Sequence, residues 1–241
     1  MDTRLSKDRM RFVKYLPLVV FLALVPLSVF CQDITTADQY FSQVADRYAQ
    51  INDYEGKITI TAGKNVMTGN IAFKAPSLIR IDFIQPPDQV INFDGQTLQV
   101  YLPAYHAILS QQVSDKAPSG VGGAALASRE GLRLMSRAYG MAFESSPAPV
   151  PLENGGGEQV VRLVLNRRSV AEGFRTIILS IDPNTKLIRR IEGWTIAGDK
   201  IVFDFTGIKL NQGIPAAHFI YDSPASANVY NNFLFGSATQ Q

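Results

Sequence analysis

The sequence is poor in the residues that usually perform chemistry or form covalent cross-links. It has one cysteine, Cys31, and two histidines, His106 and His218, in 241 residues. A single thiol excludes an internal disulfide, and neither histidine has Cys, Asp or Glu neighbours at metal-ligand spacing. The patterns HExxH, GxSxG and the P-loop are absent. We therefore expect no enzymatic role, no cofactor and no metal site.

An excess of one charge sign is also lacking. The chain has 23 Lys and Arg residues and 21 Asp and Glu residues. The first 31 residues carry five of the basic and two of the acidic ones, so 18 and 19 remain and the net charge of the remainder is about −1. A protein that binds nucleic acid needs a basic face, so this composition predicts no nucleic-acid partner.

The N-terminal segment combines a basic stretch with an apolar run. Five Lys or Arg residues lie between Arg4 and Lys14, and a nearly unbroken apolar run follows from Tyr15 to Phe30. Roughly 16 residues are too few for a membrane-spanning helix, which needs ~20, whereas this pattern is typical of a signal peptide. We predict a cleaved signal peptide over residues 1–31 and a single mature domain over residues 32–241.

The position of Cys31 leaves a second possibility for the mature N-terminus. If Cys31 is lipidated, it becomes the first mature residue and anchors the protein to a membrane. A lipidation site has a small residue before the cysteine, and Phe30 is bulky, so the sequence favours soluble secretion over anchoring. No later apolar run is long enough to span a bilayer.

The mature chain is predicted to open with an amphipathic helix. Thr35 or Thr36 is a suitable N-cap for the segment ADQYFSQVADRYAQI. Apolar residues recur within it at spacings of three and four, which places them on one side of a helix. These residues are Phe41, Val44, Tyr48 and Ile51.

After Asp53 the apolar residues recur at a spacing of two, which is typical of strands with one buried face. The short separators QPPD and DGQ have turn compositions, and Asp94-Gly95 is a strong hairpin signal. We expect an antiparallel sheet of about ten strands. The predicted strands cover residues 57–63, 69–76, 78–84, 89–93, 97–103, 106–112, 159–168, 174–182, 186–196 and 200–210.

A segment rich in Gly, Ala and Ser interrupts the strands at residues 114–127. It precedes a predicted second helix over residues 128–143, with Ser128 as its N-cap and an apolar stripe of Leu132, Met135, Tyr139 and Ala142. Residues 147–158 are predicted to form a loop. The predicted fold class is therefore α+β, mainly antiparallel β, in one domain.

The order of these segments resembles the LolA family of periplasmic carriers of outer-membrane lipoproteins. A helix is followed by GNIAFKAP, by LIRIDFIQPP and by INFDGQTLQVYLP. Near the C-terminus, the run from Phe219 to Pro224 resembles the family's closing element of two aromatic residues and a proline. The resemblance covers almost the whole mature chain and rests on order and spacing.

The resemblance implies a curved, incompletely closed β-barrel with helices covering its concave apolar face as a lid. It also implies a periplasmic carrier that takes lipoproteins by their acyl chains from an inner-membrane ABC transporter to an outer-membrane acceptor. Related proteins of this fold include outer-membrane-anchored acceptors of lipoproteins and binding modules that sense envelope lipids. Either role is the alternative function that the resemblance implies. An enzyme that acts on lipids is the weakest alternative.

The candidate site residues are apolar residues on the face implied to bind lipid and on the helix implied to be the lid. The lipid-binding candidates are Ile58, Ile60, Ile71, Phe73, Ile79, Ile81, Phe83, Phe93, Leu98, Val100 and Leu102, and the lid candidates are Leu132, Met135 and Tyr139.

Two positions depart from the family pattern. Ala75 stands where the family has an arginine that latches the lid, and Lys74 and Arg80 are the nearest cations. Gln99 stands where the family has a tryptophan. The resemblance therefore leaves open how the lid is held closed.

Overall fold

A computed structural model of the chain describes residues 35–112, 127–169 and 173–231. The predicted signal peptide, Cys31 and most of the Gly-rich segment lie outside these residues. Within the described part of the chain, none of the helices has the length and apolar character needed to cross a membrane.

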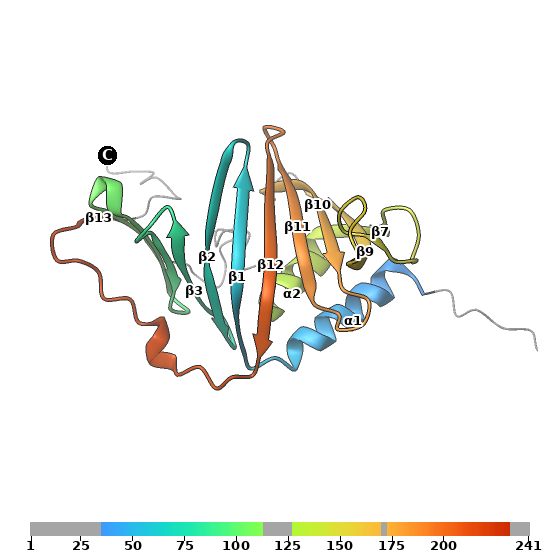
Figure 1. Cartoon of the computed structure of the whole chain (residues 1–241), viewed down its shortest axis with the longest axis horizontal. Coiled ribbons are helices and arrows are strands. Elements are labelled where there is room, and N and C mark those ends of the chain that lie inside the picture. The colour runs from blue at the N-terminus through green and yellow to red at the C-terminus, as the bar shows by residue number, and fades with distance from the viewer. Residues whose placement is uncertain (1–34, 113–126, 170–172, 232–241) are drawn as a thin grey trace, which may run out of the picture. The chain divides into compact units, whose positions relative to one another are not determined.

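One large curved sheet forms the frame of the described structure (Figure 1). Twelve strands follow one another in the order β13-β6-β5-β4-β3-β2-β1-β12-β11-β10-β9-β7, and β8 pairs with β9 beside this path. All pairs are antiparallel except β13 with β6. Because β13 and β7 lie at opposite ends of this order, the sheet is not closed. The strands are β1 (Asp53–Ala62), β2 (Asn65–Lys74), β3 (Leu78–Gln85), β4 (Val90–Phe93), β5 (Thr97–Leu102), β6 (Ala107–Gln112), β7 (Tyr139–Phe143), β8 (Val150–Pro151), β9 (Gln159–Arg167), β10 (Phe174–Ile181), β11 (Ile188–Thr195), β12 (Lys200–Leu210) and β13 (Asn228–Asn231).

Side-chain acceptors close the short turns between strands. Asp94 Oδ1 accepts hydrogen bonds from the backbone amides of Gln96 (2.9 Å) and Thr97 (2.7 Å). Gly95 has φ +96°, a conformation that favours glycine. The predicted Asp94-Gly95 hairpin is therefore confirmed, between β4 and β5.

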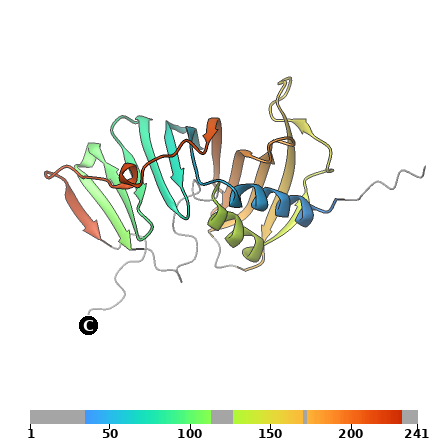
Figure 2. The ribbon, with the colours of Figure 1, turned by 90° about the horizontal axis from the view of Figure 1, so that it is seen from below.

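Both predicted helices are present. Helix α1 (Ala37–Ala49) begins with a capping box, in which the Thr36 hydroxyl accepts from the Gln39 amide and the Gln39 side chain accepts from the Thr36 amide. Helix α2 (Arg129–Ala138) begins at Ser128, whose hydroxyl accepts from the Gly131 amide at 3.1 Å. Figure 2 shows both helices lying over the part of the sheet that contains β7 and β9–β12. Short 3-10 helices in the described part of the chain include η2 (Pro103–Tyr105) and η4 (Ala216–Phe219).

The predicted end of the second helix was wrong. Helix α2 ends at Ala138, and the next five residues form β7, which pairs with β9. Tyr139 begins this strand, and Ala142 lies inside it. Gly140 is a poor helix residue, whereas Met141 and Phe143 face the apolar side of β9 when the segment is extended. The strands β8 and β13 were likewise not predicted.

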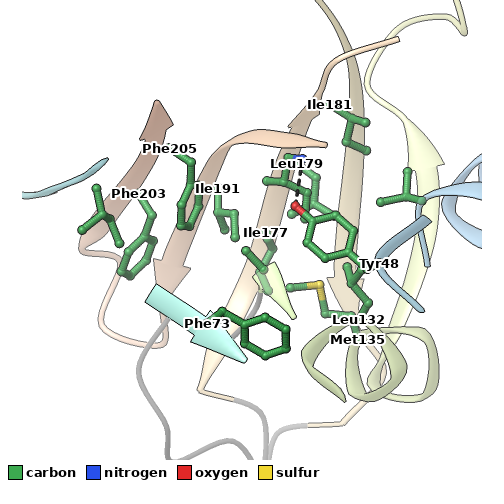
Figure 3. Packing of buried hydrophobic residues seen from close by; sticks show 14 of the residues in the cluster. Tyr48, Phe73, Leu132, Met135, Ile177, Leu179, Ile181, Ile191, Phe203 and Phe205 are labelled. Atoms are coloured by element: carbon green, nitrogen blue, oxygen red, sulfur yellow. Dashed lines mark hydrogen bonds between the residues drawn. The ribbon is translucent and has the colours of Figure 1, made fainter. Parts of the chain in front are cut away.

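The register of the strands places apolar side chains on one face of the sheet. Ile58 pairs with Phe205, Ile60 with Phe203, and Leu179 with both Ile191 and Leu163. Since directly paired residues point to the same side, these pairs form continuous rows across the sheet. Figure 3 shows Leu132 and Met135 of α2 and Tyr48 of α1 packed among strand residues of this face.

The opposite, outer face of β2–β4 is covered by the segment after β12. Lys74, Arg80 and Asn92 alternate with the apolar-face residues of their strands and therefore point outwards. Their side chains donate to the carbonyls of Ile214 (2.7 Å), His218 (3.0 Å) and Phe219 (3.0 Å), respectively. The Phe219 side chain is buried, although it does not belong to the main core cluster.

The outer face of β9–β12 carries paired charges. Buried Glu192 contacts Arg162 at 2.9 Å and Lys200 at 2.5 Å, and Arg162 also contacts Glu144 at 2.6 Å. Arg190 bridges Asp204 and Glu153 at 2.5 Å each. The charged side chains of this half of the sheet thus neutralise one another in networks.

Candidate ligand-binding face

The predicted lipid-binding residues all lie on the apolar face. Phe73 pairs with Ile79, Ile79 with Phe93, and Phe93 with Leu98, and the other candidates follow in register. Nine of the eleven are buried and nine belong to the main core cluster. The other two, Val100 and Leu102, are half-buried. The structure thus brings the predicted residues together, and their role in binding lipid stays a prediction.

Helix α2 covers part of this face through two predicted lid residues. Leu132 and Met135 are fully buried against the sheet. Tyr139 is also buried, but it lies at the start of β7, and its hydroxyl donates to the Phe174 carbonyl at 3.0 Å. Only the first two residues therefore lie on helix α2, and its role as a lid stays a prediction.

Two buried tyrosines fix the helices to the sheet. The Tyr54 hydroxyl on β1 donates to the Ala127 carbonyl at 3.0 Å, just before the N-cap of α2. The Tyr48 hydroxyl on α1 accepts from the Ile188 amide of β11 at 3.1 Å, the dashed line in Figure 3. Burial raises the pKa of Tyr48 to about 12 and raises the pKa of Tyr54 well above its ordinary value. Both hydroxyls are therefore neutral at pH 7 and serve as structural hydrogen-bonding groups.

Tyr54 was not among the predicted site residues, although the sequence contains a signal for it. Tyr54, Gly56, Ile58 and Ile60 alternate along one face of β1, so Tyr54 extends the row that the prediction began at Ile58. Its ring stacks on Phe73 with centroids 5.1 Å apart. Tyr54 therefore links the apolar face directly to the start of α2.

The predicted departure at Ala75 corresponds to an exposed position at the end of β2. Its backbone amide donates to the Asn52 carbonyl at 2.8 Å, and its methyl group has no hydrogen-bonding capacity. The two nearest cations, Lys74 and Arg80, bind the C-terminal segment on the outer face. Position 75 therefore offers no cation to the start of α2. Among the described residues, the Tyr54 hydroxyl contacts the carbonyl just before this helix.

Burial decreases along the apolar face towards β13. One cross-strand row runs from Ile81 through Ile91, Val100 and Leu109 to Tyr230. Ile81 is fully buried, the next three are half-buried, and Tyr230 is 55% exposed. The apolar face therefore continues from the packed core to the accessible edge of the sheet without a charged residue in this row.

Beneath the helices the face is filled by the protein's own side chains. A cavity of about 10 Å³ lies between Tyr48, Tyr54, Ala127 and Ile188, which is roughly the space for one water molecule. An acyl chain has no room there while α1 and α2 remain in place. Binding at this end requires a helix to move, whereas the half-buried residues on β4–β6 are already accessible.

The described residues contain no group of three His, Cys, Asp or Glu side chains positioned to bind a metal ion. His106 lies in the turn after η2, and His218 lies in η4 on the outer face. The expected absence of enzymatic activity stays a prediction.

No family model and no curated protein matches the sequence. An uncharacterised conserved protein from Thermus thermophilus has a similar structure, with a TM-score of 0.51 and 14% identity over 79% of this chain and 98% of that one. A LolA superfamily protein from Nitrosomonas europaea aligns with a TM-score of 0.42 and 12% identity over 77% of this chain and 98% of that one. A lipoprotein-sorting protein domain from Vibrio parahaemolyticus aligns with a TM-score of 0.41 and 10% identity over 76% and 97%. These likenesses concern the fold alone.

Proposed function

We propose that the apolar face of the sheet binds the acyl chains of lipoproteins and keeps them out of water during transfer from the inner to the outer membrane. The observation that supports this function is the row from Ile81 to Tyr230, which connects the helix-covered core to an accessible edge. An ordinary closed core has no such opening. The proposed activity is binding, without a chemical step.

The character of the face matches an acyl chain in polarity. Each methylene group removed from water contributes about 0.8 kcal/mol, and the row offers aliphatic side chains on four neighbouring strands and the Tyr230 ring on a fifth. Leu132 and Met135 complete a cover that exchanges its own apolar contacts for those of the ligand. The partners of this function are acylated lipoproteins, the transporter that releases them and an acceptor at the outer membrane.

Whether Cys31 carries a lipid distinguishes the carrier from a second candidate function. A lipid on Cys31 makes the protein an anchored acceptor or an envelope sensor of the same fold, whereas cleavage after Cys31 makes it a diffusing carrier. Phe30 before the cysteine favours the carrier. Mass spectrometry of the mature N-terminus separates the two functions, because a lipidated cysteine adds the mass of its acyl groups.

A binding titration tests the proposed site. A fluorescent fatty acid and a triacylated lipopeptide are titrated into the secreted protein, its Val100→Glu variant and its Ile84→Glu variant. Val100 is half-buried on the apolar face, whereas Ile84 is 61% exposed beside Phe83 and serves as the matched control. Only Val100→Glu is expected to weaken binding, because it places a carboxylate against the ligand. Equal affinities for both variants, with the parent fold retained, contradict the assignment of this face.

A further inference from the structure

The end of the sheet that contains β5, η2, β6 and β13 lacks charged residues. Residues 95–112 contain no Asp, Glu, Lys or Arg, and residues 223–231 contain none either. The opposite half has the ion-pair networks of Glu192 and Arg190 on its outer face. The described residues of this end are therefore uncharged, whereas the rest of the described surface carries charged side chains.

This uncharged end also exposes large apolar and aromatic side chains. Tyr105 is 76% exposed at the end of η2, and Val229 is 56% exposed on β13. Val229 and Tyr230 point to opposite faces of β13, since successive strand residues alternate. Among the described residues, no strand pairs with the outer side of β13. The edge strand thus presents an apolar side chain on each of its faces and unpaired backbone groups at its rim.

We infer that this edge, defined by Tyr105, Val229 and Tyr230, docks on the surface of a lipid bilayer. The inference rests on the proposed function, and it names the partner that meets the apolar face at its open end. Tyr230 ends the row that leads through Leu109 and Val100 to the core. Among the described residues of this row, a chain that leaves the bilayer at the edge passes no charged side chain on its way to the binding face.

The chemistry of the edge determines the kind of bilayer contact. Tyrosines favour the membrane–water interface because their rings are apolar and their hydroxyls are polar. The backbone groups on the side of β13 where no described strand pairs need polar partners, which the headgroup region offers and the hydrocarbon core does not. The edge therefore lies among headgroups without inserting deeply. The absence of Lys and Arg from the described residues of this edge predicts contact with zwitterionic lipid, because attraction to anionic lipid requires basic residues.

A second copy of the chain is a poorer occupant of this edge. β13 contains only four residues, and pairing of two such strands joins far fewer residues than the roughly 20–30 per side of a stable interface. The bilayer makes no such demand, since weak contacts of several side chains are sufficient for reversible docking.

Flotation with vesicles tests the inference independently of acyl-chain binding. Secreted protein is mixed with phosphatidylcholine vesicles at low and high salt, and bound protein is quantified. The double variant Val229→Lys/Tyr230→Lys is compared with Ile196→Lys, which changes an exposed apolar residue on the charged half. We expect the parent and Ile196→Lys to bind equally and independently of salt, and the double variant to bind about tenfold more weakly, which corresponds to about 1.4 kcal/mol.

Two other outcomes overturn the docking inference. Binding only to anionic vesicles, with loss at high salt, places the membrane contact on a basic surface. A stable dimer without vesicle binding assigns the edge to a second copy. Both leave the proposed function standing if the same protein still binds soluble lipopeptide. Conversely, salt-independent vesicle binding together with a failure to bind lipopeptide rejects the proposed function and leaves docking intact.

Discussion

Replacing Tyr54 with phenylalanine removes one hydroxyl from the contact between β1 and the start of α2. The Tyr54 side chain is buried, and its ring stacks on Phe73. Phenylalanine preserves that ring contact, so the substitution reports on the hydrogen bond to Ala127. Its loss leaves the buried Ala127 carbonyl without this partner, which costs roughly 1–3 kcal/mol. We expect a total destabilisation of about 1–3 kcal/mol.

The location of the effect matters more than its size. Because the hydrogen bond lies at the start of α2, Tyr54→Phe is expected to increase local opening of that helix more than opening of the sheet. Hydrogen exchange of the α2 amides measures this, and urea unfolding measures the global stability. Association with lipopeptide is expected to become faster, since the open form is more populated.

Tyr48→Phe is the matched control, because it removes a hydroxyl that binds α1 to β11 instead. Tyr48→Phe is expected to increase hydrogen exchange of the amides of α1 and of the start of β11. The reasoning is refuted if Tyr54→Phe lowers global stability while α2 exchange rises no more than that of α1. In that case the hydroxyl stabilises the core as a whole and does not hold a movable helix.

Three further outcomes follow from single sites. Phe83→Glu buries an unpaired charge in the core and is expected to destabilise by several kcal/mol in urea unfolding, whereas Ile84→Glu, at an exposed residue beside it, changes stability by less than about 0.5 kcal/mol. The folded-state pKa of Tyr48 is raised from 10.0 to about 12. The neutral Tyr48 hydroxyl therefore contributes fully to the stability of the fold below pH 10, and this stabilisation is lost as the pH rises towards 12. The free energy of unfolding falls by about 2–3 kcal/mol over this pH range. In a plot of stability against pH, Tyr48→Phe should remove this fall. Asp53, a buried carboxylate that accepts from two backbone amides, should cost about 2–4 kcal/mol when changed to alanine and less when changed to asparagine, as measured by urea unfolding.

The regular strands and α1 were predictable because their signals are local. Ile79, Ile81 and Phe83 alternate within β3, and Thr36 with Gln39 forms a capping box within four residues. The end of α2 was not predictable in this way. Tyr139 fits both the helical spacing from Met135 and the strand spacing to Met141, and pairing with β9 decides between them. β13 depends on the edge of β6, more than a hundred residues earlier in the chain.

The residues that share the apolar face were predictable from the sequence, but which of them the helices cover was not. Alternation identifies Val100 and Ile81 as residues of one face, whereas their different burial depends on where the helices lie. The same holds for the cations: the sequence shows Arg80 near the expected latch, and only the folded chain shows that it binds the His218 carbonyl on the outer face. Contacts between distant segments thus determine which residues of a predictable face are accessible.

A filled core and a ligand-binding face are compatible if the ligand contributes more than the cover loses. Exposing Leu132 and Met135 costs about 1.5–3 kcal/mol for each side chain, so displacing α2 costs roughly 3–6 kcal/mol before its hydrogen bonds are counted. An acyl chain with about 14 buried methylenes contributes roughly 11 kcal/mol at 0.8 kcal/mol each, whereas one with about six contributes roughly 5. One long chain is therefore sufficient to displace the helix, whereas a short chain contributes only about as much as the displacement costs. In the proposed function, the half-buried strip at Ile91, Val100 and Leu109 supplies the initial contact, because a chain gains affinity there before α2 has moved.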